Sequence, residues 1–158
     1  MFWHVQKAFK EAVKYRSLKI IAHIVEDLDI DLKHASFNGF FHIFLFSCQK
    51  AEREKDNDEI EINRQVIRYL TLATGTEGID SMNNSGETVL HVACEILTDP
   101  TIVRTIMEMK ADLNPVRNDD KLPLTIIKAR IEEDPDNFAL AEIEEMLEMK
   151  GAQVSWRH

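Results

Sequence analysis

The sequence predicts an all-α protein made of a row of helix pairs. Glycine and proline are scarce, with five and four residues among 158, which argues against a turn-dense β-sandwich. Apolar residues recur at spacings of three and four along several segments, and this is the period of a helix with one buried face. One pattern of turn, helix, short link and second helix also recurs, and stacked helix pairs are the architecture that such a repeat produces.

Length and composition indicate a single folded domain spanning residues 1–158. Hydrophobic residues make up 44% and charged residues 30% of the chain, and a chain of this length buries roughly 68–70% of its unfolded surface. The net charge of −9 argues against a nucleic-acid-binding arm or a polybasic membrane patch. No apolar run reaches the roughly 18 residues that a membrane helix needs, so we expect no membrane insertion.

The cysteines and the N-terminus indicate a cytoplasmic, reducing location. Cys48 and Cys94 are too few for a disulfide scaffold, and we expect both to be small buried residues. The first ten residues lack the charged and then apolar pattern of a signal peptide.

Two helix pairs are expected in the first half of the chain. Residues 20–25 form an apolar stripe that belongs to a second helix. Asn38 and Gly39 suit a turn, and the apolar segment 40–46 then forms the first helix of the next pair. Residues 66–70 continue as its second helix.

The clearest helix pair lies at residues 84–114. Gly86 suits a turn, and the sequence T-V-L-H-V-A that follows it opens a helix. Asp99 is suited to cap the next helix because its carboxylate accepts a free backbone N–H, and Pro100 suits the first helical position. Apolar residues at three- and four-residue spacing then fill 102–109.

This segment resembles the ankyrin repeat. The family pattern is a glycine turn, a T-P-L-H-x-A helix start, a second helix and a closing G-A-D-V-N; here it reads G-E-T-V-L-H-V-A and then K-A-D-L-N. The resemblance implies an ankyrin-like solenoid of about four helix-turn-helix repeats with short protruding turns. Its expected boundaries are 1–34, 35–81, 82–115 and 116–158. It also implies that the ring of His91 bonds the backbone of neighbouring turns.

The spacing of the repeats predicts two insertions. The positions that close the four repeats lie 49, 32 and 41 residues apart: Asp31, Asp80, Asp112 and Gln153. The family period is about 33 residues. The extra residues fall in the polar segments 51–59 and 132–137, between the two helices of a repeat, where they lengthen loops or helices.

These insertions also concentrate the negative charge. Residues 52–62 carry six acids and two bases, and residues 132–150 carry eight acids and one base, which gives −4 and −7. The rest of the chain is therefore +2. Because turns within helix pairs lie opposite the protruding turns, we expect an acidic rim on one edge and a near-neutral contact face.

No motif indicates an enzyme, a cofactor or a metal. The histidines lack HxxxH and HExxH spacing, and neither cysteine has a CxxC partner. The aspartates at 27, 29 and 31 are spaced as in a calcium loop, but Leu32 and Asn38 stand where glycine and glutamate are needed. Nucleophile-elbow and phosphate-binding patterns are absent from the sequence.

The resemblance implies a non-catalytic module that binds a protein partner on a concave surface of first helices and protruding turns. Residues 37–46 contain five phenylalanines. One helix face can bury about three of them, so Phe40 or Phe41 is the candidate for an exposed contact residue. The expected contact positions are Phe37, Asn38, Phe40, Phe41, Asn83, Asn84, Glu87, Asp119, Asp120 and Lys121.

Two alternatives remain open at this level. The chain could be a constitutive structural subunit of a larger assembly, held through its insertions and terminal repeats, with Trp3 and Trp156 either capping the core or docking to a neighbour. It could also regulate an enzyme by blocking a basic site, in which case binding would weaken as salt rises.

Overall fold

The chain folds into helices alone in the part that is described. The computed structural model describes residues 2–28 and 38–155, apart from the side chains of residues 2, 3, 38, 40, 43 and 72–77. Those residues contain no strand and eight helices: α1 (Phe2–Lys14), α2 (Leu18–Glu26), α3 (Asn38–Glu54), α4 (Asn57–Ile79), α5 (Val89–Ile96), α6 (Pro100–Glu108), α7 (Pro123–Glu133) and α8 (Phe138–Met149). The predicted all-α class is confirmed.

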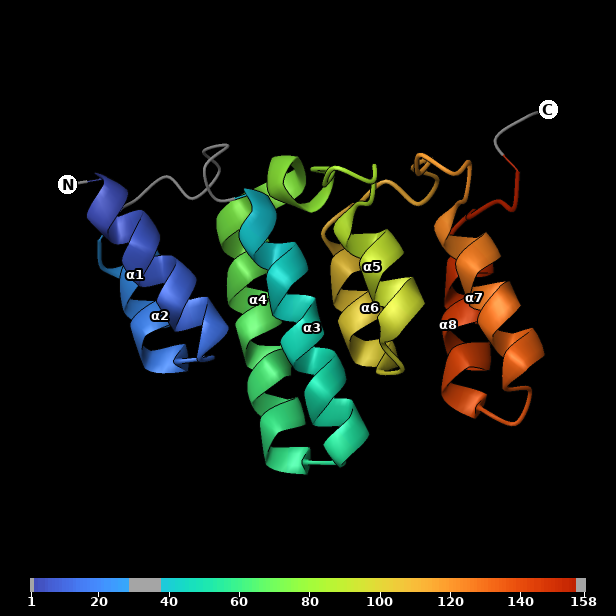
Figure 1. Cartoon of the computed structure of the whole chain (residues 1–158), viewed down its shortest axis with the longest axis horizontal. Coiled ribbons are helices and arrows are strands. Elements are labelled where there is room, and N and C mark those ends of the chain that lie inside the picture. The colour runs from blue at the N-terminus through green and yellow to red at the C-terminus, as the bar shows by residue number, and fades with distance from the viewer. Residues whose placement is uncertain (1, 29–37, 156–158) are drawn as a thin grey trace.

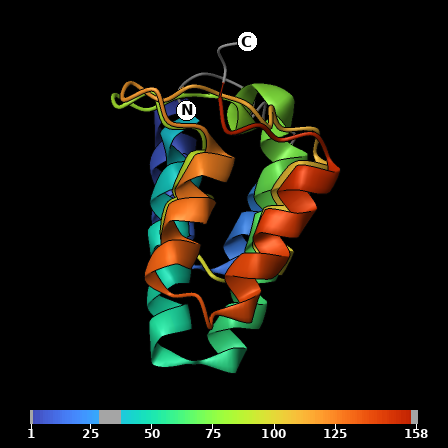
Figure 2. The ribbon, with the colours of Figure 1, turned by 90° about the vertical axis from the view of Figure 1, so that its right-hand side faces the viewer.

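The helices form four hairpins that stand side by side in two layers. Helices α1, α3, α5 and α7 pack in sequence in one layer, and α2, α4, α6 and α8 pack in the other. Figure 1 shows the hairpins in a row, and Figure 2 shows the two layers from the end of that row. The tight turn within each hairpin lies at one edge, and the longer α4–α5 and α6–α7 connections lie at the opposite edge.

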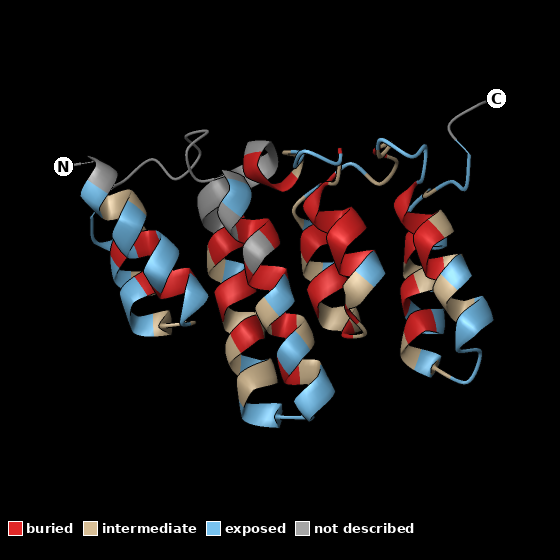
Figure 3. Cartoon of the chain, in the orientation of Figure 1, coloured by how far each residue is buried: buried red, intermediate tan, exposed pale blue. Residues whose placement is uncertain are grey.

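One hydrophobic core runs between the layers through all four hairpins. Every helix contributes to it, with the buried residues Phe9, Ile21, Phe44, Ile67, Leu90, Val103, Ile127 and Ile143 as examples in chain order. Figure 3 shows buried residues along every hairpin and exposed residues at the tips of the second and fourth hairpins. Burial of these apolar faces is the main force that holds neighbouring hairpins together.

Local capping fixes the third hairpin as the sequence predicted. The Thr88 side chain accepts a hydrogen bond from the backbone N–H of His91, and the His91 ring accepts one from the backbone N–H of Thr88. Asp99 accepts from the backbone N–H of Thr101 at 2.9 Å, and Pro100 follows it as the first residue of α6. Both helix starts are thus specified within a few residues.

The first insertion lengthens helices rather than a loop. Helices α3 and α4 are 17 and 23 residues long, and only Lys55 and Asp56 separate them. Asp56 accepts from the backbone N–H of Glu59 at 3.1 Å and so supports the start of α4. The second insertion, 132–137, covers the end of α7 and the link to α8.

The acidic rim is only partly as expected. The acidic segments 52–62 and 132–137 do lie at the hairpin-turn edge (Figure 1). The acids of α8 instead run along the helix and form ion pairs with neighbouring helices: Arg104 bonds Glu142, and Lys128 bonds Glu144 and Glu148. Because α8 turns back toward the loop edge, its charge is spread along the last hairpin.

Candidate protein-binding surface

The α4–α5 loop, residues 80–88, is a tight turn held by its own side chains. The Asn83 Oδ1 atom accepts hydrogen bonds from the backbone N–H groups of Ser85 and Glu87, both at 3.0 Å. The backbone N–H of Asn83 donates to the Glu87 carbonyl, and that of Gly86 donates to the Asn83 carbonyl. Gly86 has φ +74°, a conformation that glycine adopts without steric cost.

The α6–α7 loop, residues 109–122, repeats this turn 34 residues later. The backbone N–H of Arg117 donates to the Lys121 carbonyl at 3.1 Å, and that of Asp120 donates to the Arg117 carbonyl at 2.9 Å. Asp120 has φ +64° and occupies the place that Gly86 holds in the first turn. Aspartate is one of the few residues with a side chain that tolerate this region.

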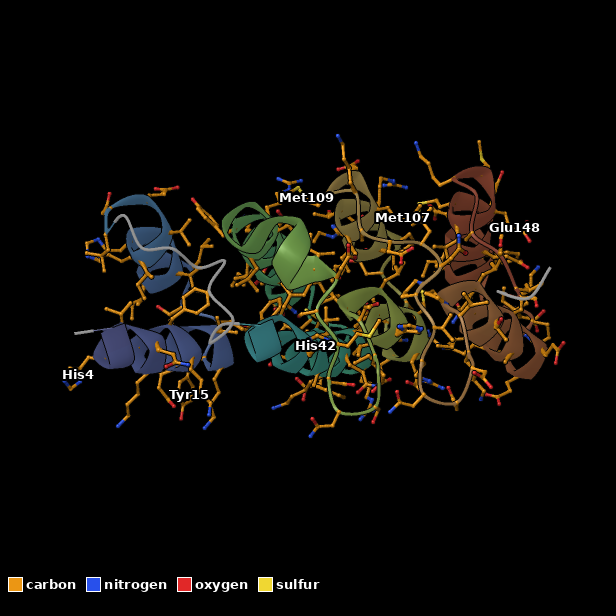
Figure 4. The ribbon with its side chains drawn as sticks, turned by 90° about the horizontal axis from the view of Figure 1, so that it is seen from above. His4, Tyr15, His42, Met107, Met109 and Glu148 are labelled. Carbon is orange, nitrogen blue, oxygen red and sulfur yellow. The ribbon has the colours of Figure 1, made fainter. Side chains whose placement is uncertain are left out.

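Asn118 joins the two loops into one surface. Its backbone N–H donates to the Ser85 carbonyl, and its side-chain amide donates to the Asn84 carbonyl, each at 3.1 Å. Figure 4 shows both loops extending over the layer of first helices, on the side away from the second helices. We call residues 81–87 and 117–121, together with Glu95 beside them, the loop surface; most of these residues are exposed, and Glu87 and Arg117 are partly covered.

Arg117 is the electrostatic centre of the loop surface. Its guanidinium binds Asp119 through two hydrogen bonds of 2.8 Å and also contacts Glu87 at 3.2 Å and Glu95 at 2.9 Å. The Arg117 side chain is only 11% exposed, while Asp119 and Glu95 are 48% and 46% exposed. The two parallel hydrogen bonds between Arg117 and Asp119 fix the orientation of both side chains.

The ionisation of these groups follows from their partners. Hydrogen bonding to Arg117 lowers the pKa of Asp119 to about 2 and, in return, raises the pKa of Arg117. Burial alone would raise the pKa of Glu87, but hydrogen bonds from Asn83 and Arg117 outweigh it, and the pKa is lowered. Asp119, Glu87 and Arg117 therefore stay charged at neutral pH. In sequence, the loop surface contains four acidic and two basic residues.

Helices α3, α5 and α7 each have one side chain that hydrogen-bonds the backbone of the segment after the same hairpin. The Nε2 of His42 lies 2.9 Å from the Glu87 carbonyl, and that of His91 lies 3.0 Å from the Lys121 carbonyl. Thr125 donates to the Val154 carbonyl at 3.0 Å. The contact of His91 with the neighbouring turn is the one that the resemblance implied.

The two histidines differ at their second ring nitrogen. The Nδ1 of His91 accepts from the backbone N–H of Thr88, so the ring is neutral and its Nε2 donates. Burial lowers the pKa of His91, which agrees with that state. The Nδ1 of His42 is buried without a partner among the described residues; three residues before it stands Gly39, which has no hydroxyl to offer.

The structure brings most of the predicted contact residues together. Five of them are exposed on the loop surface: Asn83, Asn84, Asp119, Asp120 and Lys121. Glu87 is there as well but is partly covered by Arg117. Phe37 and the side chains of Asn38 and Phe40 lie outside the described residues.

Phe41 requires a correction. Its side chain is 1% exposed and belongs to the core between the layers, so the expected surface position is wrong. The apolar segment 40–46 offered several phenylalanines to one helix face, and the phase of α3 turns Phe41 and Phe44 inward while Phe46 is exposed. Helical phase is set by packing, which the composition of the segment does not reveal.

Sequence reasoning missed the residues that organise this surface. Arg117 and Asn118 were not singled out, although Arg117 lies 34 residues after Asn83, at the same place in the second turn. The equivalence of His42 and His91 was also missed, because His42 lies inside the apolar segment 40–46 and has Gly39, not a threonine, three residues before it. Comparison of the two turns residue by residue is the signal that would have found them.

The described residues offer little reactive chemistry. Burial raises the pKa of Cys94 to about 12 and also raises that of Cys48, so both free thiols stay protonated, in the buried positions that the sequence predicted. Within residues 2–28 and 38–155, no three histidine, cysteine or acidic side chains gather as a metal site would require. None of the described helices combines the length and apolar character of a membrane span.

The chain matches no protein-family model, no curated protein and no solved structure. Its function is therefore inferred from its own surface.

Proposed function

We propose that the chain is a non-catalytic protein-binding module with an ankyrin-like arrangement of four repeats. The repeats are those expected from the sequence, 1–34, 35–81, 82–115 and 116–158. The partner is a protein that lies against the loop surface and the adjoining layer of first helices. This assignment applies the resemblance of residues 84–114 to the four hairpins of the fold.

The observation that carries this proposal is the cross-bonding of two exposed loops into one rigid polar surface. Asn118 links the loops directly, and Arg117 holds carboxylates from both loops and from α5. A surface that is ordered before binding loses less conformational entropy on association than a flexible one. The buried thiols and the fully engaged His91 ring favour binding over catalysis.

The test compares two variants with the same change of charge. Asn84→Glu with Lys121→Glu alters the loop surface, while Lys55→Glu with Asn57→Glu alters the opposite edge; all four positions are exposed. Each pair lowers the net charge by three. Proteins captured from the native cell extract are quantified for wild type and both variants, and circular dichroism checks the fold.

The loop variant is expected to capture its specific partner with an affinity at least about tenfold lower than wild type. This is the effect of removing one interface hot spot. The opposite-edge variant is expected to retain the partner. Equal capture by both folded variants would contradict the proposal.

A second candidate is a constitutive subunit held through its ends. Among the described residues, six of the eight large exposed apolar side chains lie in or beside the terminal hairpins, and the other two are Phe46 and Met82: the six are Tyr15, Ile20, Leu28, Phe138, Met149 and Val154. Exposed apolar groups of this size commonly mark contact sites. Loss of the partner in a Tyr15→Ser, Phe138→Ser variant, with retention in the loop variant, would favour this function.

A further inference from the structure

A groove lies between α6 and α8, in the layer of second helices. It has a volume of about 720 Å³ and is lined by Arg104, Met107, Glu108, Lys110, Ala111, Leu113, Met146, Met149 and Lys150. Figure 4 shows Met107 on the side of α6 that faces α8. The groove is therefore in the opposite layer from the loop surface. A result that contradicts binding at one of these sites leaves the proposal for the other unchanged.

The floor of the groove is built from flexible apolar side chains. Met107 and Met146 are half-buried in it, and Met149 is 79% exposed at its edge. Methionine adapts its shape to different apolar partners and is common on surfaces that receive amphipathic helices. The volume is within the range of about 300–1,000 Å³ that is typical of binding pockets.

The rim of the groove is basic, although the chain as a whole carries −9. Lys110 and Lys150 are exposed, and neither forms an ion pair with any described residue. Arg104 is paired with Glu142 at 3.1 Å, and Glu108 is the one acid in the lining. Two unpaired ammonium groups beside an apolar floor are complementary to a ligand with apolar and acidic groups.

Lys110 is held in a conformation that glycine prefers. It follows the C-cap of α6 with φ +60°, while the corresponding residue after α8 is Gly151 with φ +98°. A side chain in this region strains the backbone, although a cation near a helix C-terminus offsets part of that strain. Replacement of Lys110 by glycine therefore removes the charge from the rim and leaves the backbone conformation available.

We propose that this groove binds an acidic amphipathic helix of a partner protein. Apolar side chains three and four residues apart on that helix contact Met107, Met146 and Met149. Its flanking carboxylates pair with Lys110 and Lys150. This mode of recognition places an apolar helix face in a preformed groove and uses the charges to set its orientation.

The probe is a labelled helical peptide of about 15 residues with leucines on one face and glutamates on the other. Binding to the full chain is followed by fluorescence anisotropy and by the methyl signals of the methionines in NMR spectra. The signals of Met107, Met146 and Met149 are expected to shift, while Met82, exposed in the α4–α5 loop, serves as the internal reference. The same peptide with lysines in place of glutamates is expected to bind more weakly.

Three variants separate binding from folding. Lys110→Gly and Lys150→Gln are each expected to weaken binding about two- to fivefold, the scale of one exposed charge pair. Lys55→Gly is the matched control, because Lys55 follows α3 with φ +54° at the opposite edge of the molecule. It is expected to leave binding unchanged, and neither glycine variant is expected to lower stability.

Several results would overturn the proposal. The first is the absence of a methyl shift at about 1 mM glutamate peptide, a concentration at which even weak complexes form. The second is equal binding of the glutamate and lysine peptides. The third is unchanged peptide binding after Lys110→Gly. If the same methyl signals instead shift with protein concentration and sedimentation shows a dimer, the occupant is a second copy of the chain, and the assignment to a partner helix is wrong.

Discussion

At the scale of single residues, backbone conformation and side-chain contact are coupled in the loops. Gly86 and Asp120 both have positive φ at the same place in their turns, yet only one of them is glycine. The difference lies in their surroundings. A Cβ atom on Gly86 would lie 2.4 Å from the Asn118 Oδ1 and 3.0 Å from its backbone nitrogen, so the link between the loops requires glycine there.

Gly86→Ala is therefore expected to destabilise the fold by about 1–3 kcal/mol, because it adds backbone strain and displaces Asn118. The matched control is Gly39→Ala in α3, where a Cβ atom meets nothing within 4 Å. That change is expected to raise the free energy of unfolding by about 0.5–1 kcal/mol through helix propensity. Urea denaturation measures both, and equal effects of the two substitutions would refute this account of the loop contact.

The same scale shows what the sequence reveals about residues and what it does not. His91 was expected to bond a neighbouring turn, and it does so at Lys121. Phe41 was expected at the surface and is buried, and Arg117 was not expected to act at all. The contact of His91 is what the resemblance of residues 84–114 to the ankyrin repeat implied, whereas the burial of Phe41 and the ion pairs of Arg117 depend on tertiary packing.

At the scale of elements, the start of α6 is held by side chains from two other helices, α3 and α4. Glu52 at the end of α3 accepts hydrogen bonds from the backbone N–H groups of Thr98 and Asp99, at 2.9 and 2.8 Å. Asp99 caps α6 and is paired with Arg64 of α4 at 3.0 Å. Burial raises the pKa of Glu52 although these hydrogen bonds oppose the shift. The extended α3 and α4 thus reach the neighbouring hairpin, which gives the first insertion a structural role.

Asp99→Ala is expected to lower the free energy of unfolding by about 1–2 kcal/mol, because the backbone N–H of Thr101 loses its cap. Asp99→Asn keeps a capping oxygen but places an NH2 group where Oδ2 accepts from Arg64, so it loses the ion pair and that hydrogen bond and is expected to cost about 1 kcal/mol, less than alanine. Thermal and urea unfolding followed by circular dichroism distinguish the two. A cost for asparagine as large as that for alanine would show that the ion pair, and not the cap, dominates.

At the scale of the whole molecule, one continuous core joins the four hairpins, and among the described helices the main contacts link each hairpin to the next. Polar contacts reinforce the junctions at both edges. Arg130 of α7 donates to the carbonyls of Cys94 and Leu97 at 2.7 Å near the hairpin turns, and the backbone N–H of Asp112 donates to Asp80 at 2.9 Å among the loops. The described hairpins are therefore expected to unfold as one unit.

Leu147→Ala tests this in the last hairpin. Leu147 is fully buried, and its truncation is expected to cost about 2–5 kcal/mol. The urea transition should move to lower concentration as a single step with unchanged slope. Glu145→Ala, at an exposed position of the same helix, is the control and should stay within about 0.5 kcal/mol of wild type. A separate early transition for Leu147→Ala would show that the last hairpin unfolds alone.

The sequence by itself determined the helical class, the position of the third hairpin and the cap of α6 at Asp99, whereas the cap of α5 at Thr88 was found only in the structure. Those features depend on residues within one or two helical turns of each other, so local chemistry specifies them. The tertiary structure decided the burial of Phe41, the ion-pair centre at Arg117 and the methionine groove between α6 and α8. Each arises where stacked hairpins bring together residues about 20–40 positions apart, and that pairing is set by packing of the core.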